Sequence, residues 1–200
     1  MNRKIGMVSS AITLISVILF ALFMILDISS AAYAVCILLS GGYIMMAASH
    51  SCYAPKGCEA AKYIGMAFAV LYGIFVMLVY YAQITALVQG QLNEQALYLL
   101  DYKKYGLFFA YDLFGYGMLA VSTFFIGLTI APNDRETKIL KNLLLIHGAF
   151  CVVCIIPVLN LFHANVPAGD TIGVAILEVW CLYFSPICFL SYRYFKKQTN

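Results

Sequence analysis

The fold is decided by the stretch from Thr171 to Tyr192, which reads TIGVAILEVWCLYFSPICFLSY. This stretch is long enough and apolar enough to cross a lipid bilayer as a helix. One acidic residue, Glu178, lies well inside it. A carboxylate at that depth is costly, and such a group usually contacts a partner or lines a wet cavity. The stretch therefore predicts a membrane-spanning helix that is organised around one acidic side chain.

The polar and small side chains of this stretch fall on one face at helical spacing. That face carries Thr171, Val174, Glu178, Cys181, Ser185, Cys188 and Tyr192. The other faces carry mostly large apolar side chains, among them Trp180, Phe184 and Ile187. A helix with one polar seam is expected to pack that seam toward other helices, away from lipid.

The composition places the whole chain among the α-helical membrane proteins. Of its 200 residues, 64% are hydrophobic and only 10% are charged, whereas a soluble domain carries about 25% charged residues. We therefore expect an all-α membrane protein, with a single polytopic membrane domain over residues 1–200. The net charge of +3 is too small and too dispersed for a nucleic-acid-binding protein, so no nucleic-acid partner is expected.

Six apolar runs are long enough to span the lipid bilayer. They cover about residues 5–27, 32–49, 63–88, 106–131, 139–161 and 171–192. Asn93 is expected to cap a short helix in the longest connection, and Asp134 is expected to start the fifth span. Pro157 is expected to kink that span.

Lysine and arginine are distributed unevenly between the two sides that a six-span bundle creates. One side holds Lys103 and Lys104, and the other, which includes both termini, holds Arg3, Lys4, Lys56, Lys62, Arg135, Lys138, Lys141, Arg193, Lys196 and Lys197. Because basic residues favour the cytoplasmic side, both termini are expected in the cytoplasm. The expected location is a cell membrane, and the pattern fits a bacterial plasma membrane.

Polar residues from four spans reach a similar depth in the outer half of the membrane. Asp112 lies six residues into the fourth span and Glu178 seven residues into the sixth, which is roughly 10 Å of helix at a rise of ~1.5 Å per residue. Gln83 and Asn160 approach this level from the third and fifth spans, and Tyr116 lies near it. The sequence therefore predicts an outward-facing pocket with the two acids at its base and the other three residues as orienting groups.

A pocket of this kind suits a small cationic or amphipathic molecule, held by charge and by cation–π contact with tyrosine. Two neighbouring carboxylates could also share a proton and support proton-coupled movement. We therefore expect a small integral membrane protein that binds or transports such a molecule. Since 200 residues are few for a full pathway, a homodimer or a partner subunit is a further expectation.

Two other functions stay open at this point. One is an intramembrane enzyme that modifies a lipid or isoprenoid, with Asp112, Glu178 and His147 in acid–base roles. The other is a non-catalytic assembly or sensory subunit, in which the two acids are separate structural hydrogen-bond partners. His147 itself is either a proton relay or, more often for a lone histidine, a satisfied interhelical hydrogen-bonding group.

Motifs for other chemistry are absent from the sequence, including HExxH, the P-loop, GxGxxG and GxSxG. Cys151 and Cys154 have the spacing of a thiol redox pair, but their apolar neighbours favour buried thiols that are unreactive. His50, Cys52 and Cys58 match no zinc-ligand spacing, so neither a metal site nor a cofactor is expected.

In length and number of spans the chain resembles the substrate-binding membrane subunits of bacterial vitamin transporters, whose pocket also opens outward. The AxxxA motif that docks such subunits does not appear in the first span. The resemblance therefore implies an architecture and assigns a role to no residue.

Overall fold

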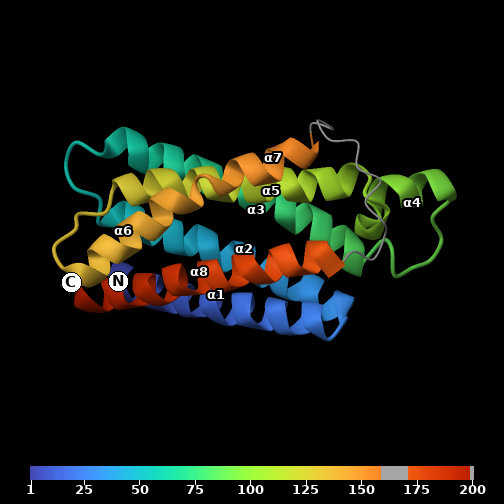
Figure 1. Cartoon of the computed structure of the whole chain (residues 1–200), viewed down its shortest axis with the longest axis horizontal. Coiled ribbons are helices and arrows are strands. Elements are labelled where there is room, and N and C mark those ends of the chain that lie inside the picture. Colours follow the sequence, from blue (N-terminus) through green and yellow to red (C-terminus); the bar gives the residue numbers. More distant parts are fainter. Residues whose placement is uncertain (159–170, 199–200) are drawn as a thin grey trace.

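The computed structural model describes residues 1–158 and 171–198, and every regular element in this part of the chain is helical (Figure 1). Two short helices, α4 (Glu94–Leu100) and η1 (Tyr102–Lys104), lie in the longest connection. The long helices are α1 (Asn2–Ile25), α2 (Ser29–Cys52), α3 (Glu59–Ile84), α5 (Leu107–Leu128), the pair α6 (Arg135–His147) and α7 (Phe150–Val158), and α8 (Thr171–Lys197). They provide six stretches long and apolar enough to cross a membrane, which confirms the all-α class and the six candidate spans.

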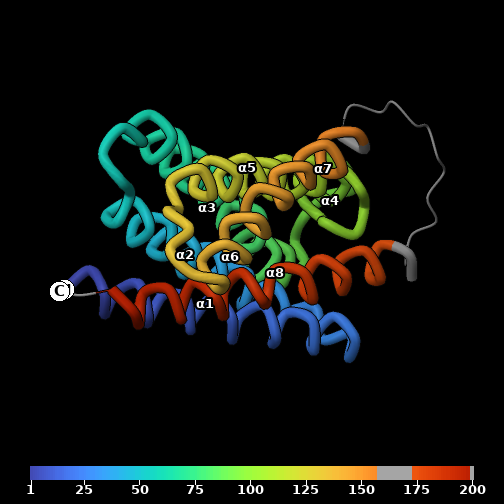
Figure 2. The backbone as a smooth tube through the Cα atoms, turned by 60° about the vertical axis from the view of Figure 1, so that its left-hand side comes forward, coloured from blue at the N-terminus to red at the C-terminus, as the bar shows by residue number. Residues whose placement is uncertain are grey.

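The helices form one elongated bundle with both termini at the same end (Figure 1). α1 packs against α2 and α8, while α5 packs against α3, α6 and α7. Figure 2 shows α1 and α8 side by side along one edge of the bundle, with α3, α5 and α7 on the opposite side. α4 lies at the end of the bundle away from the termini (Figure 1).

Close approach of α3 and α5 depends on a glycine. A Cβ atom added at Gly65 would lie 3.0 Å from the Ile126 side chain and 3.2 Å from its backbone nitrogen. Small residues at such contacts let helix backbones pack closely inside a membrane, where dispersion and hydrogen bonding rather than the hydrophobic effect hold helices together. This packing brings the polar side chains of α5 close to α3.

The face of α8 that packs into the bundle is centred on large apolar side chains. Trp180, Phe184 and Ile187 are buried, and so is Cys181 from the predicted polar seam. Glu178 is only half-buried, at the edge of this face. The predicted seam is thus buried in part, at Cys181 and Cys188, while the large apolar side chains beside it fill the core.

The fifth span is broken into two helices at a position that the sequence did not predict. α6 ends at His147 and α7 begins at Phe150. A Cβ atom added at the intervening Gly148 would lie 2.7 Å from the Cβ atom of Phe124 on α5, so the break occurs where the two backbones approach closely. Pro157, the predicted kink, lies near the end of α7.

The two predicted helix starts are confirmed. The Asn93 side chain accepts a 2.9 Å hydrogen bond from the backbone nitrogen of Ala96 at the start of α4. Asp134 accepts a 2.8 Å bond from the backbone nitrogen of Thr137, whose hydroxyl in turn accepts from the Asp134 backbone. Both caps satisfy amide groups that a helix leaves free at its first turn.

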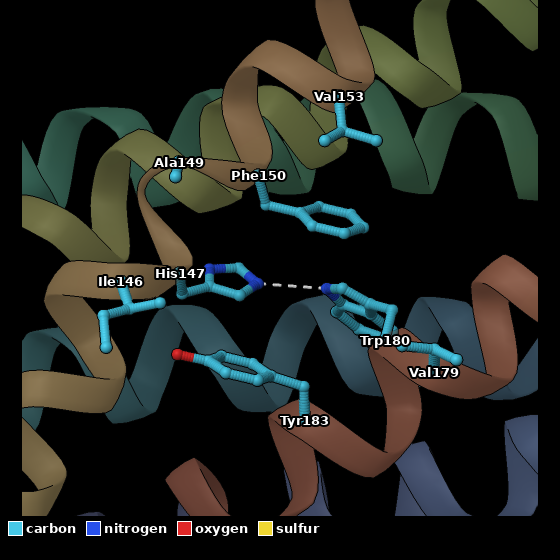
Figure 3. A pocket seen from close by; sticks show the side chains of 8 residues that line it. All are labelled: Ile146, His147, Ala149, Phe150, Val153, Val179, Trp180 and Tyr183. Atoms are coloured by element: carbon cyan, nitrogen blue, oxygen red, sulfur yellow. Dashed lines mark hydrogen bonds between the residues drawn. The ribbon is translucent and has the colours of Figure 1, made fainter.

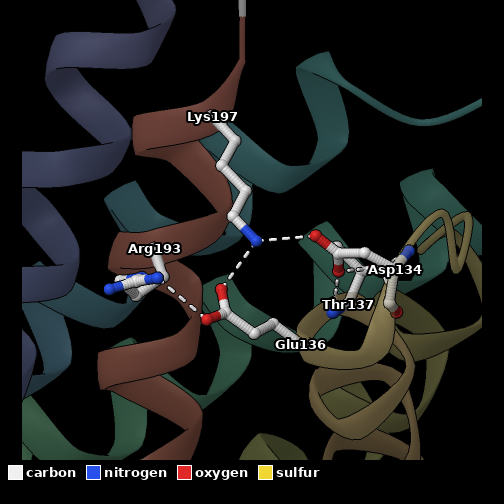
Figure 4. A network of polar contacts seen from close by, with 5 residues as sticks. All are labelled: Asp134, Glu136, Thr137, Arg193 and Lys197. Atoms are coloured by element: carbon white, nitrogen blue, oxygen red, sulfur yellow. Dashed lines mark hydrogen bonds and ion pairs between the residues drawn. The ribbon is translucent and has the colours of Figure 1, made fainter.

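Charged side chains also join the start of α6 to the end of α8 (Figure 4). Lys197 Nζ lies 2.6 Å from Asp134 Oδ2 and 2.7 Å from Glu136 Oε2. Arg193 Nη2 lies 2.9 Å from Glu136 Oε1. Exposed ion pairs are individually weak, but a network fixes one relative position of the two helix ends.

This network predicts an acid-sensitive contribution to stability. The hydrogen bond from Lys197 holds the pKa of Asp134 well below its usual value, so the folded protein binds this proton less readily than the unfolded chain does. The contribution is therefore complete at neutral pH and is lost as pH falls from about 4 through the depressed folded-state pKa. Thermal unfolding followed from pH 7 to pH 3 is expected to show a smaller acid-induced fall in Tm for Lys197→Met than for the wild type. Equal falls would show that the network does not contribute.

Candidate functional site

Asp112 is a deeply buried acidic residue on α5. Its side chain is 2% exposed, and its Oδ1 atom has no hydrogen-bond partner in the part of the chain that the structure describes. None of the ion pairs among residues 1–158 and 171–198 involves it. Burying a carboxylate without a cationic partner is costly, so either a proton or a bound cation has to balance its charge.

Three tyrosines from different elements surround this carboxyl group. The ring of Tyr33 on α2 lies 5.4 Å from the ring of Tyr80 on α3 and 6.3 Å from the ring of Tyr102 on η1. The hydroxyl groups of Tyr80 and Tyr102 approach the Asp112 carboxyl. Burial raises the pKa of Tyr102 well above its usual value, so this hydroxyl stays protonated and can donate to a carboxylate.

Tyr116, one turn further along α5, adds a fourth tyrosine to the aromatic rings around Asp112. It is 6% exposed, and its ring lies 5.6 Å from the ring of Tyr72 on α3. Its hydroxyl lies 3.8 Å from the Sγ atom of Cys36 on α2. The hydroxyl of Tyr72 is buried and has no hydrogen-bond partner within the described chain. We call Asp112 together with Tyr33, Tyr80, Tyr102 and Tyr116 the acid cage.

The segment that holds α4 and η1 covers the acid cage at the end of the bundle away from the termini, and Gln83 fixes it there. The Gln83 Nε2 atom donates a 2.7 Å hydrogen bond to the carbonyl of Leu100, and its Oε1 atom accepts a 3.1 Å bond from the backbone nitrogen of Tyr102. Both amide atoms of Gln83 are thus engaged with this segment. Because Tyr102 contacts both Tyr80 and the acid, the covering segment is itself part of the cage.

Glu178 lies apart from the cage on the edge of α8. Its Oε1 atom is enclosed and has no hydrogen-bond partner among the residues described. Cys36 lies within electrostatic range of both Asp112 and Cys181, and Cys181 lies within range of Glu178. Over the described ranges, no hydrogen bond joins the two acids.

His147 lies at the break between α6 and α7 (Figure 3), and both of its ring nitrogens are engaged. The indole Nε1–H of Trp180 donates a 3.0 Å hydrogen bond to His147 Nε2, which must therefore be unprotonated. The proton of the neutral ring is then on Nδ1, which donates to Thr123 Oγ1 at 2.7 Å. The Thr123 hydroxyl donates onward to the carbonyl of Ala120 at 2.8 Å. The chain of donors thus fixes the tautomer of His147 and makes it an interhelical hydrogen-bonding group.

The predicted site residues are thus brought together only in part. Asp112 and Tyr116 share the acid cage, Gln83 holds its cover, and Glu178 lies at the edge of α8. Asn160 lies outside the described residues. Sequence reasoning missed Tyr102, in the connection before the fourth span, and Tyr33, which belongs to the second span. Its spacing of three residues from Cys36 places both on one face of α2, but nothing in the sequence points that face at Asp112.

The described residues contain no group of three or more His, Cys, Asp and Glu side chains that could hold a metal ion. Comparison of the chain with protein-family models, curated proteins and solved structures finds no match in any of the three.

Proposed function

We propose that this multi-pass membrane protein binds or transports a small cationic or amphipathic molecule, with Asp112 as the charged anchor. The observation that carries the proposal is a carboxyl group that is 2% exposed, has an unpaired oxygen and faces several tyrosines. Ionisable groups inside a membrane usually mark a ligand or ion pathway. The tyrosine rings add faces that attract a cation.

The proposed orientation places both termini in the cytoplasm. All Lys and Arg residues except Lys103 and Lys104 lie in the connections at the termini's end of the bundle or in the helix turns next to those connections and to the termini. By the positive-inside rule, the end that carries α4 and η1 then faces outward. A bacterial plasma membrane fits this orientation. The acid cage would thus be reached from outside, beneath the α4–η1 segment.

The same contacts support a simple exchange mechanism. Without a ligand, a proton on Asp112 balances the charge; an arriving cation takes the place of that proton, which leaves to water. Opening the cage requires that Gln83 release the backbone of Leu100 and Tyr102, so these two hydrogen bonds oppose opening. Glu178 on α8 is proposed to assist, as is Asn160. A homodimer or partner subunit would complete a pathway for transport.

Binding of small cations tests the proposal. The protein in phosphatidylcholine nanodiscs would be titrated calorimetrically with tetramethylammonium, guanidinium and butylammonium. We expect at least one of them to bind, and Asp112→Asn to weaken that binding by about tenfold or more, which is about 1.4 kcal/mol. The reason is that the asparagine keeps the shape but loses the charge.

The matched control is Asp27→Asn, the same charge change on an exposed residue in the α1–α2 turn at the same end of the bundle. Its positive φ of 53° is a conformation that asparagine also adopts. It should bind the cations as the wild type does. If no cation binds in an Asp112-dependent way, the proposal is overturned and the assembly or sensory subunit becomes the leading interpretation.

A further inference from the structure

A groove of about 280 Å³ opens on the side of the bundle, between the α6–α7 break and α8 (Figure 3). Phe150 and Val153 line it from α7, and Val179, Trp180 and Tyr183 line it from α8. Val153 and Val179 are 50% and 66% exposed, so the groove opens on the lateral surface of the bundle. In a membrane this surface faces lipid chains, because the helices that form it are candidate spans.

The groove offers no free polar atom on the side chains that line it. Both ring nitrogens of His147 are engaged, with Trp180 and Thr123. The hydroxyl of Tyr183 donates a 2.8 Å hydrogen bond to the carbonyl of Leu143. The ring of His147 is stacked between Phe150 and Tyr183, so its faces are covered as well. A group that occupies this groove therefore has to be hydrocarbon.

Trp180 separates the groove from the acid cage. Its side chain lines the groove, yet it is 2% exposed, and its ring also lies 5.3 Å from the ring of Tyr116. Tyr116 is a member of the cage. A molecule in the groove and a cation in the cage would thus contact opposite sides of one aromatic pair.

We infer that the groove takes the hydrocarbon tail of a ligand whose cationic head is bound by Asp112. The ligand class is then single-chain lipophilic cations, which enter by a lateral route from the membrane in addition to the outer route beneath the α4–η1 segment. The inference rests on the proposed function and narrows its ligand from a small cationic or amphipathic molecule to a cationic amphiphile with one hydrocarbon chain. Trp180 has to shift for the head to pass, and its hydrogen bond to His147 holds the closed position. Charge complementarity selects a cation, since the acid at the inner end of this route has no cationic partner among the described residues.

Quenching of Trp180 tests the inference, because it is the single tryptophan of the chain. The probe is dodecyltrimethylammonium with bromine at the end of its chain, added to the protein in phosphatidylcholine nanodiscs. We expect saturable quenching that unbrominated dodecyltrimethylammonium reverses. Val153→Phe fills the groove and should raise the half-saturating concentration about tenfold, while tetramethylammonium, which has no tail, binds as before.

The matched control is Val152→Phe. Val152 is 59% exposed on the same turn of α7 but does not line the groove. Quenching of Trp180 in Val152→Phe should therefore equal that in the wild type. Asp112→Asn should raise the half-saturating concentration for quenching by about tenfold or more. Cation binding that depends on Asp112 but is insensitive to Val153→Phe overturns the tail site and leaves the proposed function standing. Saturable quenching that ignores Asp112→Asn overturns the link between groove and cage. If no cation depends on Asp112, the proposed function itself fails.

Discussion

Replacing Ser122 by alanine is expected to lower the free energy of unfolding by about 2 kcal/mol, because one hydroxyl joins three helices. Ser122 on α5 accepts a 2.7 Å hydrogen bond from the hydroxyl of Tyr43 on α2 and donates a 2.6 Å bond to the carbonyl of Gly65 on α3. Alanine would leave the Tyr43 hydroxyl, on a side chain that is 2% exposed, without its partner. The measurement is unfolding by dodecyl sulfate in mixed micelles, followed by circular dichroism.

The control is Ser10→Ala, which removes a hydroxyl that is just as buried. Ser10 is 0% exposed, but its hydroxyl bonds only to the carbonyl of Gly6 in its own helix. Such a bond adds little to a carbonyl that the helix already satisfies, so the change should stay within about 0.5 kcal/mol.

A second substitution identifies the cause. Adding Tyr43→Phe to Ser122→Ala removes the stranded hydroxyl and should restore part of the lost stability. If the two substitutions destabilise the protein additively, the Tyr43–Ser122 bond does not hold α2 to α5.

The spans could be predicted from the sequence because the membrane imposes one rule on all of them: backbone polar groups must be bonded within a helix. The predicted ends of the spans were less accurate. The third span was expected over residues 63–88, whereas α3 runs from Glu59 to Ile84. Hydropathy reports the part of a helix that lies in hydrocarbon. The backbone hydrogen bonds of α3 continue through polar Lys62 to Glu59, outside that part.

The position of Asp112 near the start of its helix could also be predicted, because α5 begins at Leu107, close to the expected start of the fourth span. The surroundings of Asp112 could not, because Tyr33, Tyr80 and Tyr102 come from three other elements and meet the acid through tertiary packing. The same limit applies to α8. The sequence pattern around Glu178 shows only how polar each face of α8 is. The rotation of the helix depends on where the large side chains of Trp180 and Phe184 fit among their neighbours, which the pattern does not show.

The break after His147 could not be inferred from composition at all, since apolar residues continue through it. It exists because Gly148 allows α6 to approach Phe124 on α5, a contact between residues far apart in sequence. Irregular backbone at membrane depth persists only where protein or a lined cavity surrounds it. Here it adjoins the lateral groove, and that is why the break and the proposed tail site occur together.

Replacing His147 by leucine is expected to lower the free energy of unfolding by about 2 kcal/mol and to shift the fluorescence emission of Trp180. The imidazole accepts from Trp180 on α8 and donates to Thr123 on α5, so it links three helices at the break. Leucine has similar bulk but leaves the buried indole N–H without an acceptor. Unfolding in dodecyl sulfate micelles and the emission spectrum of the folded state measure the two effects.

The neighbouring Ile146→Leu is the control, because this side chain is 61% exposed and should change stability by less than about 0.5 kcal/mol. Trp180→Phe placed in the His147→Leu background removes the stranded donor and should recover part of the stability, which a loss of packing alone would not allow. An unchanged emission spectrum in His147→Leu would contradict the hydrogen bond itself. His147 also forms the inner wall of the groove, between Phe150 and Tyr183. If His147→Leu also loses the Val153-dependent quenching by the brominated cation, the contact that stabilises the break also shapes the groove.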